Sequence, residues 1–115
     1  MVKQSVALDG VFGALSDPVR RNIVERLTRG ELTAGEIASG FSISQPAVSK
    51  HLKVLERCGL VKRTIVGREH HLRLVPRTMH VASQWIDRQR AYWNASFDRL
   101  DQLLEKQTSE SELPS

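Results

Sequence analysis

The sequence predicts a mainly α-helical protein with a small β-hairpin wing: a winged helix-turn-helix with a long C-terminal helix. Three observations lead to this fold class. Two capped helices follow one another closely between residues 33 and 59, two runs rich in β-branched and apolar residues come directly after them, and residues 78–106 contain neither Gly nor Pro. A short helix, a tight connection, a second helix and then a hairpin is the order of a winged helix-turn-helix.

The length and composition are those of one small basic domain. The chain has 115 residues, a formal net charge of +4 and a sequence pI near 9.7, a balance that favours anionic partners such as nucleic acid. We expect one domain over residues 1–107 and a disordered tail over 108–115, where "TSESELPS" lacks large apolar groups. The single cysteine, Cys58, excludes an internal disulfide and a thiolate cage for zinc.

Two helices are predicted before the helix-turn-helix. In "SDPVRRNIVERLTRG", Asp17 is the candidate N-cap, Pro18 takes the first helical position and Gly30 is the stop. Ahead of it, apolar residues of segment 5–15 recur at helical spacing and predict a first helix. They are Leu8, Val11, Phe12 and Leu15.

The helix-turn-helix pair is marked by caps at the start of each helix. Thr33 and Glu36 have the spacing of a capping box, which begins a brief helix in "TAGEIASGF". Ser44 can cap the next helix, Pro46 then falls in its first turn, and Gly59 lies just past its end.

The wing and the last helix complete the fold. The runs "LVKRTIV" and "EHHLRLV" are separated by Gly67 and Arg68, which predicts a hairpin that Pro76 closes. From Thr78 to about Lys106 the apolar residues recur at helical spacing. Such a helix would be roughly 40 Å long, longer than a domain of this size is wide.

This last helix carries more large apolar residues than one small domain can cover, so we expect a second copy of the chain to cover them. A helix folded back on its own domain is the alternative. Trp85, Tyr92 and Trp93 could instead line a ligand cavity, although aromatic residues at helical spacing are more often core or interface. The predicted dimer-interface residues are Leu8, Val11, Phe12, Trp85, Tyr92, Trp93, Phe97 and Leu100.

The helix that begins after Ser44 has the two faces of a DNA-recognition helix. Val48, Leu52 and Leu55 form an apolar face, while the opposite face is short-chained at its start and basic further along. Residues 44–73 hold seven Lys or Arg against two Glu, a net charge of +5. The predicted DNA-binding residues are Ser44, Gln45, Pro46, Ala47, Ser49, Lys50, His51, Lys53, Arg63, Arg68 and Arg73.

The side chains of this set suit different parts of a duplex. Gln45 can make a bidentate contact with adenine, and Lys50 can reach guanine or backbone oxygens. Arg68 lies at the expected hairpin tip, where a guanidinium can enter the minor groove or contact phosphate. For His51, a contact with the DNA backbone and a packing role both remain open. A solvated helix surface is the alternative reading of the whole face.

These residues resemble the ArsR/SmtB family of bacterial winged-helix repressors. The resemblance lies in "ALSDPVRRNIVERL", "ELTAGEIA" and "SISQPAVSKHLKVLERCGLVKRTIVGREHHLRL", and covers about Val11 to Val75. It implies a homodimer joined through the first and last helices, with two recognition helices in successive major grooves. The last helix is similar to that of a branch with a tryptophan-bearing terminal helix.

The resemblance does not extend to the metal sites that many members of the family carry. Thr33 and Gly35 stand where those members have a cysteine pair, and His80, Asp87 and Glu105 lack a second histidine at the required spacing. His70 and His71 are neighbours on a strand and point to opposite faces. We therefore expect no metal and no cofactor, a structural role for both histidines, and a packing role for Cys58.

The predicted function is a dimeric repressor that binds a palindromic operator in double-stranded DNA, with its own gene as a candidate target. The alternatives are a sensor of the same fold that responds to an effector or metal at a non-standard site, and a winged helix used only for contact with another protein. An enzyme is disfavoured because no nucleophile with its base, paired carboxylates or Gly-rich phosphate loop is found. Lacking a membrane-spanning run and a signal peptide, the chain is expected to be cytoplasmic.

Overall fold

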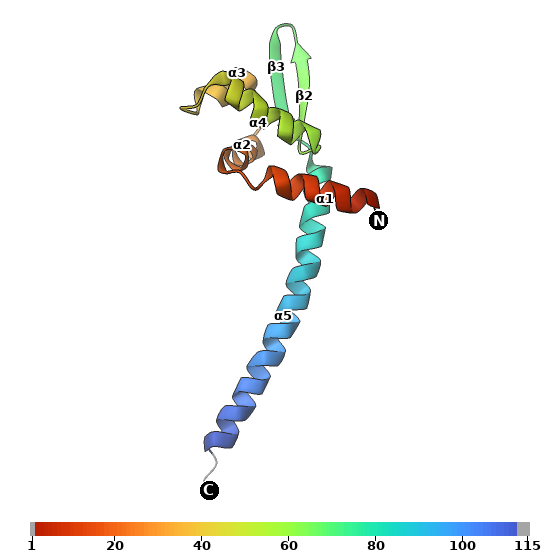
Figure 1. Ribbon diagram of the computed structural model, residues 1–115, viewed down its shortest axis with the longest axis vertical. Coiled ribbons are helices and arrows are strands. Elements are labelled where there is room, and N and C mark those ends of the chain that lie inside the picture. Colours follow the sequence, from red (N-terminus) through yellow and green to blue (C-terminus); the bar gives the residue numbers. More distant parts are fainter. Residues whose placement is uncertain (1, 113–115) are drawn as a thin grey trace. The chain divides into compact units, whose positions relative to one another are not determined.

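The computed structural model describes the backbone of residues 2–112 and the side chains of residues 8–108. The chain divides into two compact units, Met1–Ala82 and Ser83–Ser115. The single domain over residues 1–107 expected from the sequence stays a prediction. Figure 1 labels its elements. In chain order they are α1 (Val2–Ala14), α2 (Pro18–Thr28), β1 (Leu32–Thr33), α3 (Ala34–Ser39), α4 (Gln45–Arg57), β2 (Val61–Val66), β3 (Glu69–Leu74) and α5 (Pro76–Glu112).

Side-chain caps fix the starts of the helices in the first unit, as the sequence predicted. The Asp17 carboxylate accepts two backbone N–H groups at the start of α2. At α3, Thr33 and Glu36 form both bonds of a capping box, with distances of 3.1 and 3.0 Å. At α4 the Ser44 hydroxyl accepts from the Ala47 amide at 3.3 Å. Each cap satisfies donors that the first helical turn leaves without an intrahelical partner.

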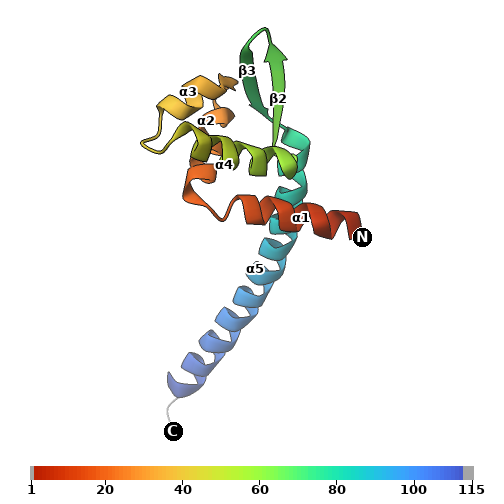
Figure 2. The same cartoon turned by 45° about the horizontal axis from the view of Figure 1, so that its top comes forward.

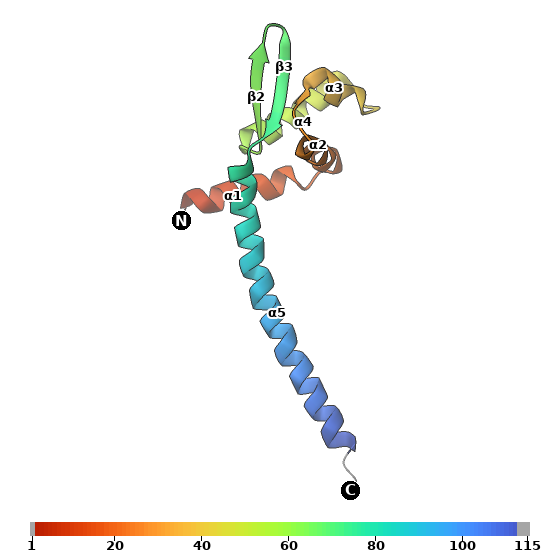
Figure 3. The same cartoon turned by 180° about the vertical axis from the view of Figure 1, so that it is seen from behind.

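The strands form one antiparallel sheet in the order β1-β3-β2. The predicted hairpin is present, with Val66 paired to Glu69 across a turn in which Gly67 has a φ of +64°. β1 was not predicted, because its two residues are too short to show alternation. In the first unit, the free end of the hairpin projects away from helices α2, α3 and α4 (Figures 1 and 3).

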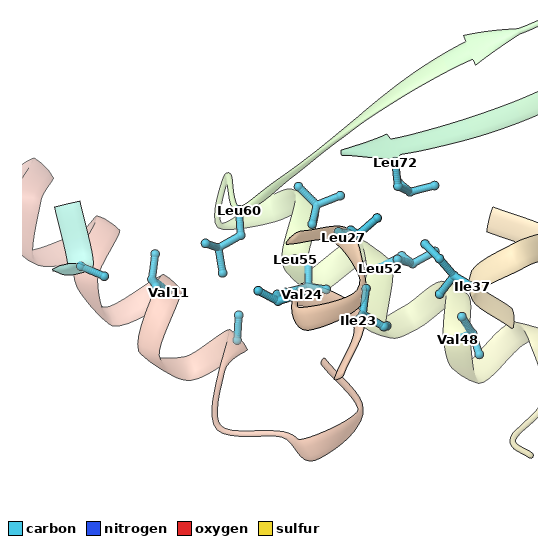
Figure 4. Close-up of a cluster of buried hydrophobic side chains, with 13 residues drawn as sticks. Val11, Ile23, Val24, Leu27, Ile37, Val48, Leu52, Leu55, Leu60 and Leu72 are labelled. Atoms are coloured by element: carbon cyan, nitrogen blue, oxygen red, sulfur yellow. The ribbon is translucent and has the colours of Figure 1, made fainter. Parts of the chain in front are cut away.

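The core of the first unit centres on α4, which contacts α1, α2, α3 and β2 (Figure 2). The predicted apolar face of α4, formed by Val48, Leu52 and Leu55, is buried against α2, α3 and the sheet (Figure 4). The remaining buried residues are Val11, Ala14, Ile23, Val24, Leu27, Ile37, Leu60, Val61, Leu72 and Ala82. This packing leaves the other face of α4 uncovered by the rest of its own unit.

One predicted interface residue belongs to this core. Val11 is only 1% exposed, so its side chain packs within its own chain and cannot reach a partner. Helical spacing placed it on the same stripe as Leu8 and Phe12, but the burial of that stripe is uneven: Leu8 is half-buried and Phe12 is 37% exposed.

The second unit consists of the larger part of α5. The helix is longer than expected at both ends: it begins at Pro76 instead of Thr78 and continues to Glu112. Proline is well tolerated in the first turn of a helix, and Pro76 therefore starts α5 as well as ending the hairpin. Residues 108–112 of the expected disordered tail are helical, and 113–115 lie outside the described residues. Over the described residues, no helix has the length and apolar character to cross a bilayer.

Candidate nucleic-acid interface

The outer face of α4 presents short side chains at its start and cations one turn later. Ser44, Gln45 and Pro46 are exposed, and Ala47 and Ser49 are half-buried with no bulk beyond a methyl or hydroxyl group. Pro46 fits here because an amide in the first turn has no intrahelical acceptor. A backbone surrounded by such small side chains can approach the base edges of a groove about 12 Å wide.

Lys50 and Lys53 continue this face toward the C-terminal half of α4, and both are exposed. The structure thus brings together seven predicted residues of one face, from Ser44 to Lys53, in about two turns of helix. Cations at the margin of a groove lie where phosphates pass, and they supply the part of the binding free energy that does not depend on sequence.

The wing adds a second cluster of cations. Arg68 occupies the turn between β2 and β3 and is exposed. Arg73 on β3 lies directly opposite Lys62 on β2, and both are exposed. Opposed like charges on neighbouring strands are unfavourable unless an anion lies nearby, and DNA phosphate is such an anion. Lys62 was missing from the predicted DNA-binding residues, although the period-two spacing of strand side chains could have paired it with Arg73.

Arg63, which was predicted to contact DNA, has partners within the protein. Its guanidinium is half-buried and donates to the Glu56 carboxylate through Nε at 3.2 Å and through a terminal nitrogen at 2.5 Å. Its other terminal nitrogen lies 2.9 Å from Nδ1 of His70. Arg63 therefore ties the wing to α4, and its charge is already paired inside the protein. Lys62, Arg68 and Arg73 are the exposed cations of the wing.

His51 lies at the edge of the outer face of α4. The contacts of its ring with other residues are made by Nδ1. Nδ1 is 3.2 Å from a terminal nitrogen of Arg20 and 3.7 Å from an Asp17 oxygen. The same Asp17 oxygen accepts from the amides of Val19 and Arg20. The hydrogen bond from the Arg20 amide holds the pKa of Asp17 below its ordinary value. His51 is thus fixed by the start of α2 while its ring is 22% exposed.

His70 and His71 point to opposite faces of β3, as expected, because His70 contacts Arg63 while His71 contacts two carboxylates. Nδ1 of His71 is 3.3 Å from Glu31, and Nε2 is 3.1 Å from Glu69. Glu31 precedes β1, so His71 connects the short strand β1 with the wing. Both histidines have structural partners within the first unit.

The second unit exposes one continuous apolar stripe on α5. At about 100° per residue, the stripe spans roughly 140° of the helix surface, and only uncharged polar side chains interrupt it. Within it the rings of Trp93 and Phe97 have centroids 6.1 Å apart. The exposed apolar residues are Trp85, Ile86, Tyr92, Trp93, Phe97, Leu100, Leu103 and Leu104. Ile86, Leu103 and Leu104 extend the predicted set by the same helical periodicity.

Metal ligands do not gather in the described part of the chain. Among the side chains of residues 8–108, no three His, Cys, Asp or Glu lie close enough together to hold an ion. Cys58, which was expected to have a packing role, is half-buried against the core, and its thiol lies 3.4 Å from the Leu55 carbonyl oxygen.

Comparison with known proteins agrees with this geometry. A family model described as a helix-turn-helix domain matches residues 15–64. The HTH-type transcriptional regulator Rv2034 of Mycobacterium tuberculosis is 36% identical over 99 residues, which cover 86% of this chain and 90% of that protein. The transcriptional repressor SdpR of Bacillus subtilis is 44% identical over 54 residues, covering 47% of this chain and 60% of SdpR.

A solved structure extends the similarity beyond the helix-turn-helix. The ArsR-like transcriptional regulator from Rhodococcus sp. RHA1 has 32% sequence identity and a TM-score of 0.71, and the match covers 86% of this chain and 93% of that one. Identity at this level over nearly the whole of two regulators, together with the exposed basic face of α4 and the wing, establishes the relationship. The chain belongs to the ArsR/SmtB family of winged helix-turn-helix transcriptional regulators, which bind DNA and are not enzymes.

Proposed function

We propose that the protein is a homodimeric repressor that binds a palindromic operator, with α4 in the major groove and the wing beside the adjacent minor groove. The observation that carries this proposal is the outer face of α4, where small side chains give way to Lys50 and Lys53 while the opposite face is fully buried. A solvated helix surface would not need its smallest side chains at the N-terminal end, whereas a recognition helix uses that end to approach bases.

Gln45 and Ser49 are the candidates for base contacts because they lie at the start of α4 and carry hydrogen-bonding groups on short or flexible stems. A glutamine amide can pair with the N6 and N7 edge of adenine. Lys50, Lys53, Lys62, Arg68 and Arg73 are candidates for phosphate contacts. This division assigns sequence reading to the first turn of α4 and most of the salt-dependent affinity to the later cations.

The homodimer is supported by the apolar stripe on α5. A helix surface that exposes eight large apolar residues without an intervening charge is unusual for a monomer, and a second copy offers an identical stripe as its cover. A two-fold dimer presents two recognition helices, so its operator should have half-sites about 10 base pairs, or a multiple of that, between centres.

Repression is supported by the relatives, since SdpR is named a transcriptional repressor. A bound dimer that covers a promoter excludes polymerase without any catalytic step. This role also supports a cytoplasmic location, where bacterial DNA lies.

Footprinting tests the proposal. DNA flanking the protein's own gene is incubated with the full chain at moderate salt and cleaved with a chemical nuclease. We expect a protected region with two-fold symmetry and half-sites separated by about one helical turn or a multiple of it. Protection without symmetry, or none at all on flanking DNA and on a random-sequence library selected for binding, would contradict the proposal.

A further inference from the structure

We propose that Arg20 is a positioning residue for DNA binding: it holds His51 in the tautomer that carries its proton on Nε2, and this N–H donates to a phosphate of DNA. The inference rests on the proposed function, because it assumes that α4 lies against a duplex. It adds a residue of α2, outside the helix-turn-helix pair and the wing, to the DNA-binding machinery.

The guanidinium of Arg20 uses all three of its nitrogens. Nε donates to the carbonyl oxygen of Ala14 at 2.6 Å, and one terminal nitrogen donates to that of Gly13 at 3.2 Å. Both carbonyls lie at the C-terminal end of α1, where helix carbonyls lack intrahelical partners. The other terminal nitrogen points to Nδ1 of His51, 3.2 Å away. Because the guanidinium is planar and two of its nitrogens are bonded to α1, the direction of the third nitrogen toward His51 is fixed by those two bonds.

The chemistry of this pair decides the tautomer. A guanidinium is charged at all ordinary pH values and has no acceptor, so in the bond between Arg20 and His51 the arginine donates. Nδ1 of His51 must then be the unprotonated nitrogen, and the proton of the neutral ring is on Nε2. The Asp17 oxygen at 3.7 Å is beyond hydrogen-bond distance from Nδ1 and already accepts two backbone amides. It therefore does not compete for a proton on Nδ1.

Nε2 of His51 has no hydrogen-bond partner among the described side chains, residues 8–108, and is open to solvent. Among the described side chains, no buried nitrogen or oxygen atom lacks a hydrogen-bond partner. His51 is only partly exposed, so an Nε2 without a partner must reach the surface. It does so on α4, beside Lys50 and one turn after Ala47, at the margin of the face proposed to enter the groove. A neutral N–H at this margin is suited to a phosphate oxygen.

Two isosteric substitutions separate the ring nitrogens. His51→Asn keeps an acceptor near the position of Nδ1 and loses the outward donor, whereas His51→Gln keeps a donor near Nε2 and loses the acceptor. We expect His51→Asn to weaken operator binding about tenfold, since a hydrogen bond to a charged group is lost, and His51→Gln to stay within about threefold of the unchanged protein. The salt dependence should be the same in both, because a neutral donor displaces no counterion.

A double-mutant cycle then tests the part played by Arg20. Arg20→Gln should weaken binding about tenfold in the unchanged protein but by less than about threefold in the His51→Gln background, where no tautomer needs to be fixed. If Arg20 acted only through its bonds to α1, the loss would be equal in both backgrounds. Arg21→Gln is the matched control, because among the described residues the Arg21 guanidinium donates to the Leu15 carbonyl and not to α4. All variants are first shown to be folded at the assay temperature by thermal unfolding.

The tautomer is also measured without DNA. Long-range ¹H–¹⁵N NMR spectra distinguish a protonated from an unprotonated ring nitrogen, and we expect Nδ1 of His51 to be unprotonated in the unchanged protein and partly protonated in Arg20→Gln. A protonated Nδ1 in the unchanged protein, an additive cycle, or equal losses in His51→Asn and His51→Gln would each overturn the inference while leaving operator binding intact. An unchanged protein that bound no DNA would overturn the proposed function, and the spectrum would still decide the tautomer.

Discussion

Single carboxylates and hydroxyl groups define where the helices of the first unit begin, and at Asp17 this role is linked to pH. Its carboxylate accepts the amides of Val19 and Arg20, and the bond from the Arg20 amide lowers its pKa from the ordinary value. The pKa of Glu36 is lowered as well, first by the hydrogen bond from the Thr33 amide. Both groups bind fewer protons in the folded than in the unfolded state, so they stabilise the fold above about pH 4.

Replacing Asp17 by Asn should therefore flatten the acid side of the stability profile. The stabilisation by the carboxylate is present above its unfolded pKa and is lost as pH falls through the folded pKa, whereas an asparagine cap does not titrate. Between about pH 5 and pH 3 we expect the melting temperature of Asp17→Asn to fall by less than that of the unchanged protein. Near pH 7 the two melting temperatures should be similar. Circular dichroism melts would show this, with Asp98→Asn on α5 as control. Superimposable profiles of Asp17→Asn and the unchanged protein would refute it.

At the residue scale the caps could be predicted and the long-range pairs could not. Asp17, Thr33 and Ser44 were identified because a cap and the helix that it starts are neighbours in the sequence. The bond between Arg20 and His51 joins residues 31 positions apart, and helical periodicity contains no information on such a pair. For the same reason the bonds of Arg63 were not predicted, since its partners Glu56 and His70 meet it only through the packing of α4 and the hairpin.

At the scale of elements, α4 and the wing form the interface that the proposed function uses, and α4 depends on its cap. Among the described side chains, the acceptor at the start of this helix is the Ser44 hydroxyl, which accepts a hydrogen bond from the Ala47 amide. That start is also where the base contacts are proposed, so fraying of this turn would affect both stability and DNA binding.

Ser44→Ala should destabilise the protein by about 1 kcal/mol, the typical effect of removing an N-cap. Operator affinity should fall further than the loss of one hydrogen bond explains, because Gln45 and Ser49 lose their fixed geometry. Chemical denaturation and fluorescence anisotropy with labelled operator measure the two effects. Ser42→Ala, an exposed serine in the preceding turn, is the control and should match the unchanged protein. Equal stability of the two variants would contradict the role given to Ser44.

The elements themselves followed from local patterns, and the errors have local causes. The hairpin was predicted because Gly67 and Arg68 separate two runs rich in β-branched and apolar residues, and α4 because its apolar residues recur at helical spacing. β1 was not predicted, because a strand of two residues forms through its pairing with β3 and has no pattern of its own in the sequence. Its last residue, Thr33, was recognised only as the cap of α3.

At the scale of the whole molecule, the second unit carries the proposal of a dimer. The apolar stripe of α5 was predicted from sequence because its residues lie on one helix and periodicity reveals them. The surface that packs against the stripe could not be predicted in the same way, because the periodicity of one helix does not identify the helix or chain that covers it. The burial of Val11 shows the same limit. Its place on an apolar stripe predicted that it would be covered, but not whether its own core or a partner chain would cover it.

A charge placed in the stripe should dissociate the dimer. Phe97 is 56% exposed and lies within the apolar stripe, about halfway along its length, so Phe97→Glu would bury a carboxylate in the proposed interface. We expect this variant to be monomeric in size-exclusion chromatography with light scattering. Gln102→Glu introduces the same charge on an exposed position about 140° around α5 from Phe97, outside the stripe, and should remain dimeric. A monomeric unchanged protein, or two dimeric variants, would contradict the proposed assembly.

The dependence of DNA affinity on salt tests the central claim, that α4 and the wing bind DNA, most directly. Operator affinity is measured over a range of salt concentrations for Lys50→Ala and Arg68→Ala, with Lys106→Ala and Arg88→Ala on α5 as matched controls. Each lost phosphate contact should reduce the slope of log affinity against log salt by about 1. We expect weaker binding with a shallower slope for Lys50→Ala and Arg68→Ala, and unchanged slopes for the two controls. Slopes equal to that of the unchanged protein in all four variants would contradict it.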